Sequence, residues 1–305
     1  MALKKNARYA FGLNYLRIRP LNADLSQPSA DNLIGGAGPF DFSGASSAAA
    51  VPFVVKIDGG DEKKLTADLS SAVAIAAVTG AELVAALNSA LTTASVSVTA
   101  SLEEQTNRIK IAHATANELQ FYGEVAEVAL FGQGFGMKIL TSDTMRTFSD
   151  TPVRKDGERI TTTDAWGFDT EVITDGYYKG FTAQLVDTAE DWELLALLEG
   201  TPLDKDGNLS SPVFGTKRPI VFIEAFYGAY AKGQNYEGEL VAWRKVECFH
   251  CKGMGGEKTR ERGFSDDPYT IEGLTWVDET GKMQPAWKRS SISLEDFAKL
   301  DIENV

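Results

Sequence analysis

The sequence predicts a mainly β fold with a few helices (α+β), and three observations support this. Sixteen Phe, nine Tyr and five Trp suit packed sheet faces. Segments with alternating residues are separated by turn-rich stretches, as in antiparallel sheets. The helical patterns are short and capped. With 305 residues, 43% of them hydrophobic, the chain is long enough for one large domain or two ordinary ones.

The charge argues against a nucleic-acid-binding protein. Thirty basic and 43 acidic residues give a net charge of −13, whereas a protein that grips DNA needs a basic face to displace counterions. The excess of acidic residues fits a soluble surface on which like charges repel one another. It also fits a surface along which DNA passes without binding.

The N-terminal sequence and the cysteines indicate the cellular compartment in which the protein is made. We expect no signal peptide in the first 20 residues, and no apolar run approaches the 18 residues of a membrane span. Two cysteines three residues apart make no disulfide framework. Synthesis and assembly in a bacterial cytoplasm would fit.

The first 50 residues predict an arm and a linker. Residues 1–20 alternate aromatic and basic side chains, which indicates a strand or extended arm that ends at Pro20. Residues 21–50 contain many Gly and Pro and predict a linker or a wrapping segment.

Residues 51–131 form a compositional block rich in Ala, Val, Ser and Thr, and they predict a ββαββ module. A hairpin turns at residues 58–61, and a helix over 80–91 follows the capping box of Thr79 and Glu82. SVSVTAS and NRIKIAHA predict two more strands, while residues 119–131 fit either a strand or a short helix. We expect this module to be inserted in a core made of residues 1–50 and 132–305, and to face outward.

The rest of the chain predicts most of the core. Residues 132–160 indicate turns, and residues 158–200 predict two strands, a short helix and a stop. Thr188 and Asp191 have helix-capping spacing, and Gly200 suits the position after the helix. A long hairpin turning near 233–235, a strand over GFSDDPYTIEGLTWVD and a short acidic helix after Ser293 follow.

The segment CFHC is the only metal-like cluster. Structural zinc needs four ligands, and Cys248, His250 and Cys251 supply at most three, while His113 lies in another module. On a strand, Cys248 and His250 would share a face and Cys251 would point away. We therefore favour the interpretation that these three residues are ordinary strand residues, over a role in redox chemistry or in a metal site between subunits.

Two other motifs favour plain structure. DKDGNLS (Asp204, Asp206, Asn208, Ser210) lacks the glycine and glutamate positions of a calcium loop, so a surface turn is preferred. GQGFG (Gly132, Gly134, Gly136) has no dinucleotide-binding context and indicates a hinge between modules.

No catalytic, cofactor-binding or metal-binding residue is therefore predicted, and we expect no enzyme. With two histidines, neither beside a marked nucleophile, a catalytic triad has no support. Paired acids are common in so acidic a chain, and four are expected on solvated faces: Glu103, Glu104, Asp266 and Asp267.

The second half resembles phage tail tube proteins (the major tail protein family). The resembling segments are KILTSDTMRTFSDTPVRKDGERITTTDAWGFDT, YYKGFTAQLVDTAEDWELLALLEG, PIVFIEAFYGAYAKGQNYEGELVAWRKVECF and GFSDDPYTIEG. The likeness covers roughly residues 1–20 and 137–285 and consists of patterns of strand and turn. The block over 51–131 departs from a minimal tube subunit.

The resemblance implies a β-sandwich or small barrel with one flanking helix, in subunits that form stacked, hexameric rings. The rings would make a virion tail tube through which DNA passes during ejection without sequence-specific binding. Partners would be other copies of the chain, and possible further partners are the tail sheath, baseplate and tail terminator proteins. Arg8, Arg17 and Arg19 would pair with acidic patches on the next subunit, or be ordinary surface charges.

Two other classes remain open. One is another virion part, such as a sheath-like, baseplate or decoration protein, which the inserted module favours. The other is a carbohydrate- or surface-binding β-protein, which would need a pocket lined by exposed aromatic residues. Candidates are Trp166, Trp243, Trp276 and Trp287.

Overall fold

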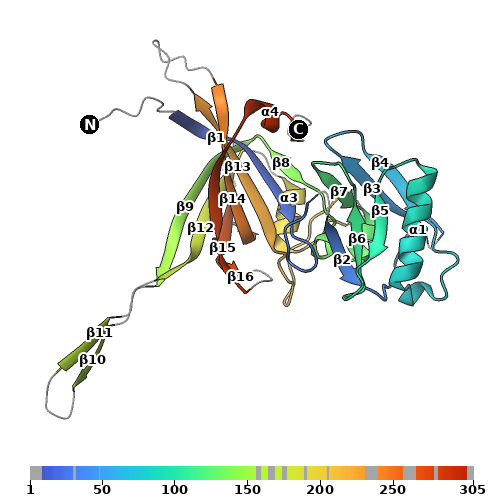
Figure 1. Cartoon of the computed structure of the whole chain (residues 1–305), viewed down its shortest axis with the longest axis horizontal. Coiled ribbons are helices and arrows are strands. Elements are labelled where there is room, and N and C mark those ends of the chain that lie inside the picture. The colour runs from blue at the N-terminus through green and yellow to red at the C-terminus, as the bar shows by residue number, and fades with distance from the viewer. Residues whose placement is uncertain are drawn as a thin grey trace.

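The computed structural model describes most of the chain. The described residues are 9–29, 32–47, 49–155, 159–163, 169–173, 177–188, 191–204, 206–230, 240–256, 266–277 and 281–300. The fold is mainly β, as predicted, with large antiparallel sheets and few helices (Figure 1). None of the helices in these ranges is long and apolar enough to cross a membrane.

One antiparallel sheet of eight strands forms the larger part of the molecule. Seven strands follow one another in the order β8 (Leu140–Ser142), β1 (Tyr9–Pro20), β13 (Val221–Tyr230), β14 (Leu240–Gly255), β15 (Asp267–Leu274), β12 (Tyr177–Asp187) and β9 (Met145–Lys155). The eighth, β18 (Trp287–Ile292), pairs with β14.

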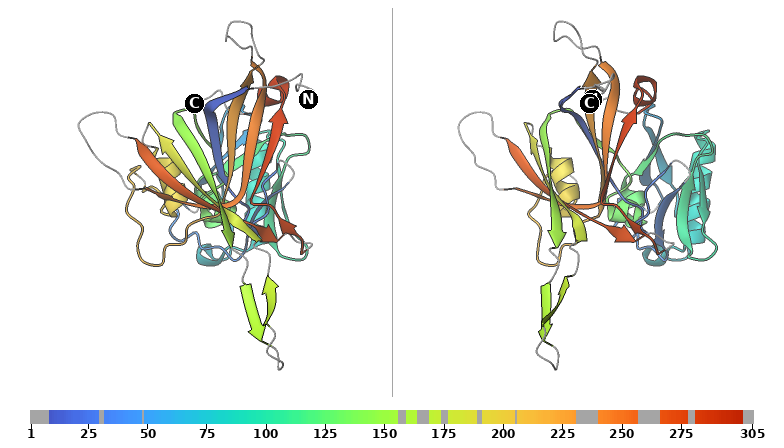
Figure 2. Two further views of the ribbon diagram at one scale, coloured as in Figure 1. Left: turned by 90° about the vertical axis from the view of Figure 1, so that its left-hand side faces the viewer. Right: turned by 60° about the vertical axis from the view of Figure 1, so that its left-hand side comes forward.

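The sheet curls because its two end strands are consecutive in the chain. β8 and β9 are joined through Asp143 and Thr144, so the ends of the sheet are brought to one corner. The buried carboxylate of Asp187, on β12, accepts hydrogen bonds there from the hydroxyls of Ser142 (3.2 Å) and Thr144 (2.5 Å). The result is an open, barrel-like sheet whose two halves face each other across α3 in Figure 2.

Helix α3 (Trp192–Glu199) is the flanking helix of this sheet. Asp191 caps it by accepting a hydrogen bond from the backbone of Leu194, and Gly200 ends it with φ 74°. Four leucines of the helix pack into the core beneath the sheet, with strand residues such as Ile18, Phe181 and Ile271. Asp191, and not Thr188, is the cap: the Thr188 hydroxyl donates to the Thr144 carbonyl instead.

A second core lies beside the sheet and is built from two three-stranded sheets and helices. Its strands are β2 (Leu33–Ala37), β6 (Arg108–Ala112) and β5 (Thr99–Leu102) in one sheet, and β4 (Lys63–Ala67), β3 (Val51–Ile57) and β7 (Leu119–Tyr122) in the other. Its helices are α1 (Gly80–Thr93) and α2 (Glu124–Val128), with short 3-10 turns η1 (Ile75–Ala77) and η2 (Phe131–Gly134). The predicted hairpin and capping box are both present.

The packing differs from the expected module boundary at residue 51. Leu33, Phe40 and Phe42 lie in the segment predicted to be a linker, yet they are buried in the second core, which extends to Met137. The physical reason is that β2 supplies a third strand beside β6, which buries apolar side chains that Gly and Pro had masked in the sequence. We call residues 33–137 the side module.

Several further elements differ from the predictions or refine them. Residues 132–160 were expected to carry turns, and the resembling segment that begins at Lys138 was expected to contain polar strands. β9 is such a strand and is 11 residues long. The strand β18 was not predicted. Residues 119–131, which fitted either a strand or a short helix, contain β7, α2 and the start of η2.

Within the described residues, the C-terminal part of the chain adds three short elements. The acidic tail helix is α4 (Leu294–Phe297), capped by Ser293 as expected. The strand β16 (Trp276–Val277) pairs with β17 (Met283–Gln284).

A hairpin of β10 (Arg159–Thr163) and β11 (Asp169–Ile173) lies outside the body of the molecule. In both views of Figure 2, as in Figure 1, it extends beyond the end of β9 and β12. Its strands pair with each other in register from Arg159↔Ile173 to Thr163↔Asp169. We call β10 and β11 together the hairpin arm.

Candidate assembly surfaces

A buried cluster of charges joins the side module to the large sheet. β1 alternates, so that Leu16 and Ile18 enter the core and Arg17 points to the other face. There the Arg17 guanidinium donates to Glu224 of β13 (3.2 Å) and to Glu118 of the side module. Arg17, Glu118 and Glu224 are all at least 90% buried, so these charges are largely withdrawn from bulk solvent.

The charges in this cluster shift one another's pKa. Burial raises the pKa of Glu224, but Arg17, Arg19 and Lys245 together bring it below its usual value. Burial lowers the pKa of Lys245, yet Glu224 and Glu247 raise it above its usual value. The Lys245 ammonium lies 3.2 Å from Glu224 and 2.8 Å from Glu247. Both shifts favour the charged forms of Glu224 and Lys245, which balance each other within the chain.

Of the three arginines expected at a contact between subunits, the structure describes two, and their surroundings differ. Arg17 pairs inside the chain, so it is neither an intersubunit contact nor an ordinary surface charge. The guanidinium of Arg19 lies over the Phe222 ring, 5.2 Å from its centroid. Arg8 lies outside the described residues. Sequence reasoning could not find the Arg17 partners, which are 101 and 207 residues away.

The glycine cluster GQGFG lies where the two cores meet. Gly132, Gly134 and Gly136 all have positive φ, and Phe131 packs in the side module. The Gln133 amide donates to the Ile220 carbonyl (2.8 Å) and accepts from the Ile220 amide (2.9 Å). The predicted hinge is thus a junction fastened to the large sheet by two hydrogen bonds.

The cysteine prediction was wrong in one respect, because a β-bulge changes the alternation. Val221 pairs with Cys251 and Ile223 with Cys248, so two residues of β14, Phe249 and His250, lie opposite the single residue Phe222 of β13. His250 has φ 36°. Both cysteines consequently face the core and are buried, while His250 stacks on Trp276 at 4.3 Å. Among the described residues, no three His, Cys, Asp or Glu side chains are arranged to hold a metal.

DKDGNLS folds as a self-contained turn. The Asp204 carboxylate accepts hydrogen bonds from the backbone amides of Asp206 (2.9 Å) and Asn208 (2.8 Å). These bonds, with the Asn208 side-chain amide, lower the pKa of Asp204. The carboxylate is used by the turn itself, which is the surface turn that the sequence favoured.

One of the four acids expected on solvated faces is buried. Asp267 pairs in register with Asp187, and only 5% of it is exposed. Its neighbour Asp266 is exposed and forms an ion pair with Arg146 (3.2 Å). Glu104 is also exposed, and Glu103 accepts from the Thr106 hydroxyl.

Two of the four candidate tryptophans take part in packing. Trp243 is buried and stacks on Phe297 at 4.2 Å, and the Trp287 indole donates to the Tyr178 hydroxyl at 3.0 Å. Trp276 lines a hollow of about 700 Å³. Trp166 lies outside the described residues.

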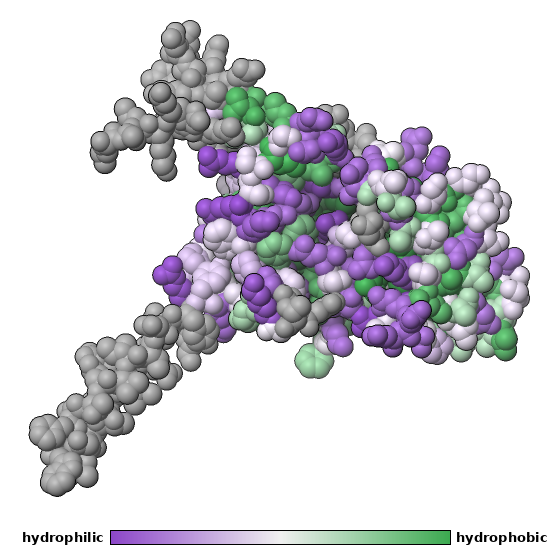
Figure 3. Space-filling view, viewed as in Figure 1, coloured by the Kyte–Doolittle hydropathy of each residue, from purple (hydrophilic) through white to green (hydrophobic). Residues whose placement is uncertain are grey.

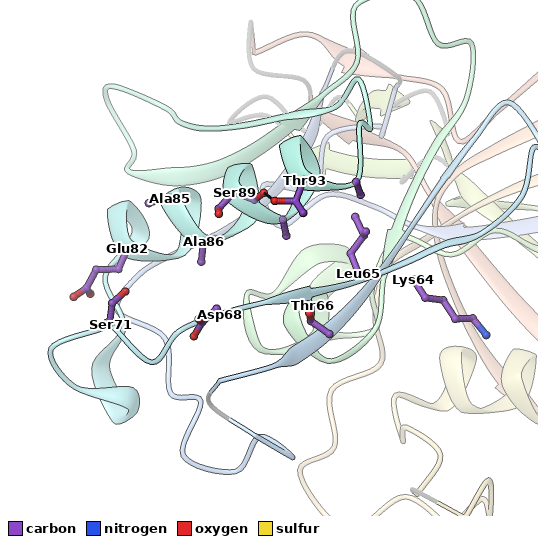
Figure 4. Close-up of a pocket in the computed structure, with 12 residues that line it drawn as sticks. Lys64, Leu65, Thr66, Asp68, Ser71, Glu82, Ala85, Ala86, Ser89 and Thr93 are labelled. Atoms are coloured by element: carbon purple, nitrogen blue, oxygen red, sulfur yellow. Dashed lines mark hydrogen bonds between the residues drawn. The ribbon is translucent and has the colours of Figure 1, made fainter.

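The side module has a groove without reactive groups. It lies between α1 and β4 (Figure 4), has a volume of about 640 Å³, and is lined mainly by small and polar side chains such as Ala86, Ser89 and Thr66. Its one glutamate, Glu82, is already bonded to Thr79 in the capping box. On the face shown in Figure 3, hydrophilic residues dominate and hydrophobic ones form small, separate groups.

The surfaces that remain suited to contact with other chains are strand edges, the arm and one loop. β9 pairs with β12 on one side, and no strand of the described ranges pairs along its other side. The hairpin arm lies outside the body, and Val213 and Phe214 of the loop before β13 are exposed. Sequence reasoning missed this loop, although an apolar pair directly after SSP was a possible signal.

No protein-family model matches the chain, and the search of curated proteins found no match.

Proposed function

We propose that the chain is a structural subunit of a phage tail tube, which assembles with copies of itself into stacked rings around a channel for DNA. The observation that carries this proposal is the hairpin arm at the end of a curled antiparallel sheet whose strand β9 pairs, among the described strands, on one side only. A two-stranded hairpin is marginally stable alone in water, so it needs a surface to pack on. Another copy of the chain supplies that surface.

Two other features support a role in the virion wall. An unpaired strand edge is a template for pairing with another chain, and ring closure removes it. The net charge of −13 suits a channel wall that repels the DNA backbone. The side module, locked to the sheet through Arg17 and Glu118, would decorate the outside of the tube.

Shortening the arm tests this proposal. Lys155 pairs with Tyr177, so an Asn-Gly turn in place of residues 156–176 closes the β9–β12 hairpin without the arm. We expect sedimentation velocity to show large assemblies of the full chain and rings or monomers of the shortened chain. A Val73→Ser chain, altered at an exposed residue of the side module, is the matched control. Equal assembly of all three chains would contradict the arm's role.

A further inference from the structure

A turn in the loop before β13 holds two apolar side chains in solvent. Phe214 is fully exposed and Val213 is 76% exposed. The Thr216 amide and hydroxyl both donate to the Val213 carbonyl (3.0 and 2.8 Å), and the Val213 amide donates to the Thr216 hydroxyl (3.1 Å). Single exposed apolar residues are ordinary, but this adjacent pair is presented on a hydrogen-bonded turn. We call Val213 and Phe214 the knob.

A hollow elsewhere on the chain offers an apolar and aromatic wall. It has a volume of about 700 Å³ and lies between the bulge of β14, the strand β16 and the turn of residues 24–27. Phe249 and the stacked pair of His250 and Trp276 form part of its lining. Val277, which also lines it, is 55% exposed, and its cross-strand partner Met283 is 62% exposed.

The knob and the hollow do not bury each other within one chain. Phe214 is fully exposed, and the left view of Figure 2 shows the loop of residues 201–220 and the β16 strand on opposite sides of the sheet. Two complementary features on different surfaces of one molecule form a head-to-tail contact, which generates a ring when the rotation closes. That is the symmetry which the proposed function requires.

We propose that Phe214 of one copy inserts into the hollow of the next copy, with Val213 against the exposed Val277. The inference rests on the proposed self-assembly and names the side-by-side contact within it. An aromatic anchor in a pocket is the kind of contact that dominates interface energies. An opposite charge is available on each surface, because exposed Lys217 follows the knob in the chain and Asp24 lines the hollow.

Photo-crosslinking of the full chain identifies the surface that the knob touches. p-Benzoylphenylalanine replaces Phe214, the assemblies are irradiated, and the joined peptides are read by mass spectrometry. We expect adducts between copies at Phe249, at Trp276–Val277 or near Pro285. The same probe at Val73, which is 94% exposed on the side module, is the matched control. Adducts on another surface, or no more adducts than the control gives, overturn the proposal.

A second pair of variants measures the strength of the contact. Phe214→Asp is expected to raise the concentration at which assembly begins by about tenfold or more, and so is Val277→Asp on the rim. Val73→Asp leaves that concentration unchanged. If the unaltered chain assembles and Phe214→Asp assembles equally well, this inference fails alone. If the unaltered chain is monomeric at every concentration, the proposed function fails, and this contact with it.

Discussion

At the scale of single residues, the molecule depends on buried charges that are balanced across two parts of the chain. Arg17 lies on the sheet, Glu118 on the side module and Glu224 on the neighbouring strand, and each is at least 90% buried. A buried ion pair costs desolvation, so its removal from one side leaves an uncompensated charge. The side module is therefore positioned by electrostatics as well as by packing.

Replacement of Glu118 by Ala tests this joint. The change leaves the buried Arg17 with one carboxylate partner, and we expect the free energy of unfolding to fall by about 3 kcal/mol. Urea unfolding measures it, and Glu104→Ala, at an exposed acid of the same module, should stay within about 0.5 kcal/mol. A loss as small as the control's would show that the joint does not hold the module.

The lowered pKa of Glu224 predicts a loss of stability in acid. Burial raises this pKa, but Arg17, Arg19 and Lys245 lower it further, so the folded state binds the proton less tightly than the unfolded chain. Its stabilisation is complete above the unfolded pKa, about 4.3, and disappears as the pH falls through the folded pKa. We expect the urea midpoint to drop below about pH 4.3, and less steeply in Glu224→Gln. Identical slopes would contradict the prediction.

The two thiols should be unreactive in the folded chain. Cys248 and Cys251 are buried, and burial, followed by the neighbouring Cys248, raises the pKa of Cys251. A thiol reagent that reacts with thiolates should therefore label neither in native buffer and both in urea. A Val73→Cys chain should gain one thiol that reacts at once. Fast labelling of the unaltered native chain would show that the β14 bulge opens.

At the scale of elements, local signals were predictable and long-range ones were not. The capping box of Thr79 and Glu82 and the stop at Gly200 involve neighbours in sequence, and both are present. β2 was missed, and β9 was expected only through the family resemblance, because both strands depend on partners distant in the chain and not on their own Gly-rich or polar sequences. The face of Cys251 was misassigned because one bulge shifts the alternation.

Two glycines separate the effect of backbone conformation from that of crowding. Gly200 and Gly207 have φ of 74° and 80°, but a Cβ on Gly200 would lie 2.3 Å from the Lys217 carbonyl oxygen and one on Gly207 would meet nothing. We expect Gly207→Ala to cost about 1 kcal/mol of unfolding free energy and Gly200→Ala about 3 kcal/mol. Thermal or urea unfolding compares them. Equal losses of unfolding free energy in the two variants would mean that the backbone around Gly200 moves to accommodate the added methyl group.

At the scale of the whole molecule, the chain has features that a single copy leaves unused. The hairpin arm lies outside the body, one edge of the large sheet is unpaired within the described residues, and Phe214 is exposed at a turn. These features were only partly foreseeable: the sequence pattern suggested a β-rich subunit, but the arm's reach and the knob depend on the three-dimensional arrangement. Each becomes useful when copies associate.

Electron microscopy of the purified full chain over a series of concentrations tests the central proposal most directly. We expect stacked rings or hollow tubes with a bore wide enough for duplex DNA, about 20 Å across, and their loss when an Asn-Gly turn replaces the hairpin arm. Single particles of monomer size at every concentration would contradict the proposal that this chain builds a tube by itself.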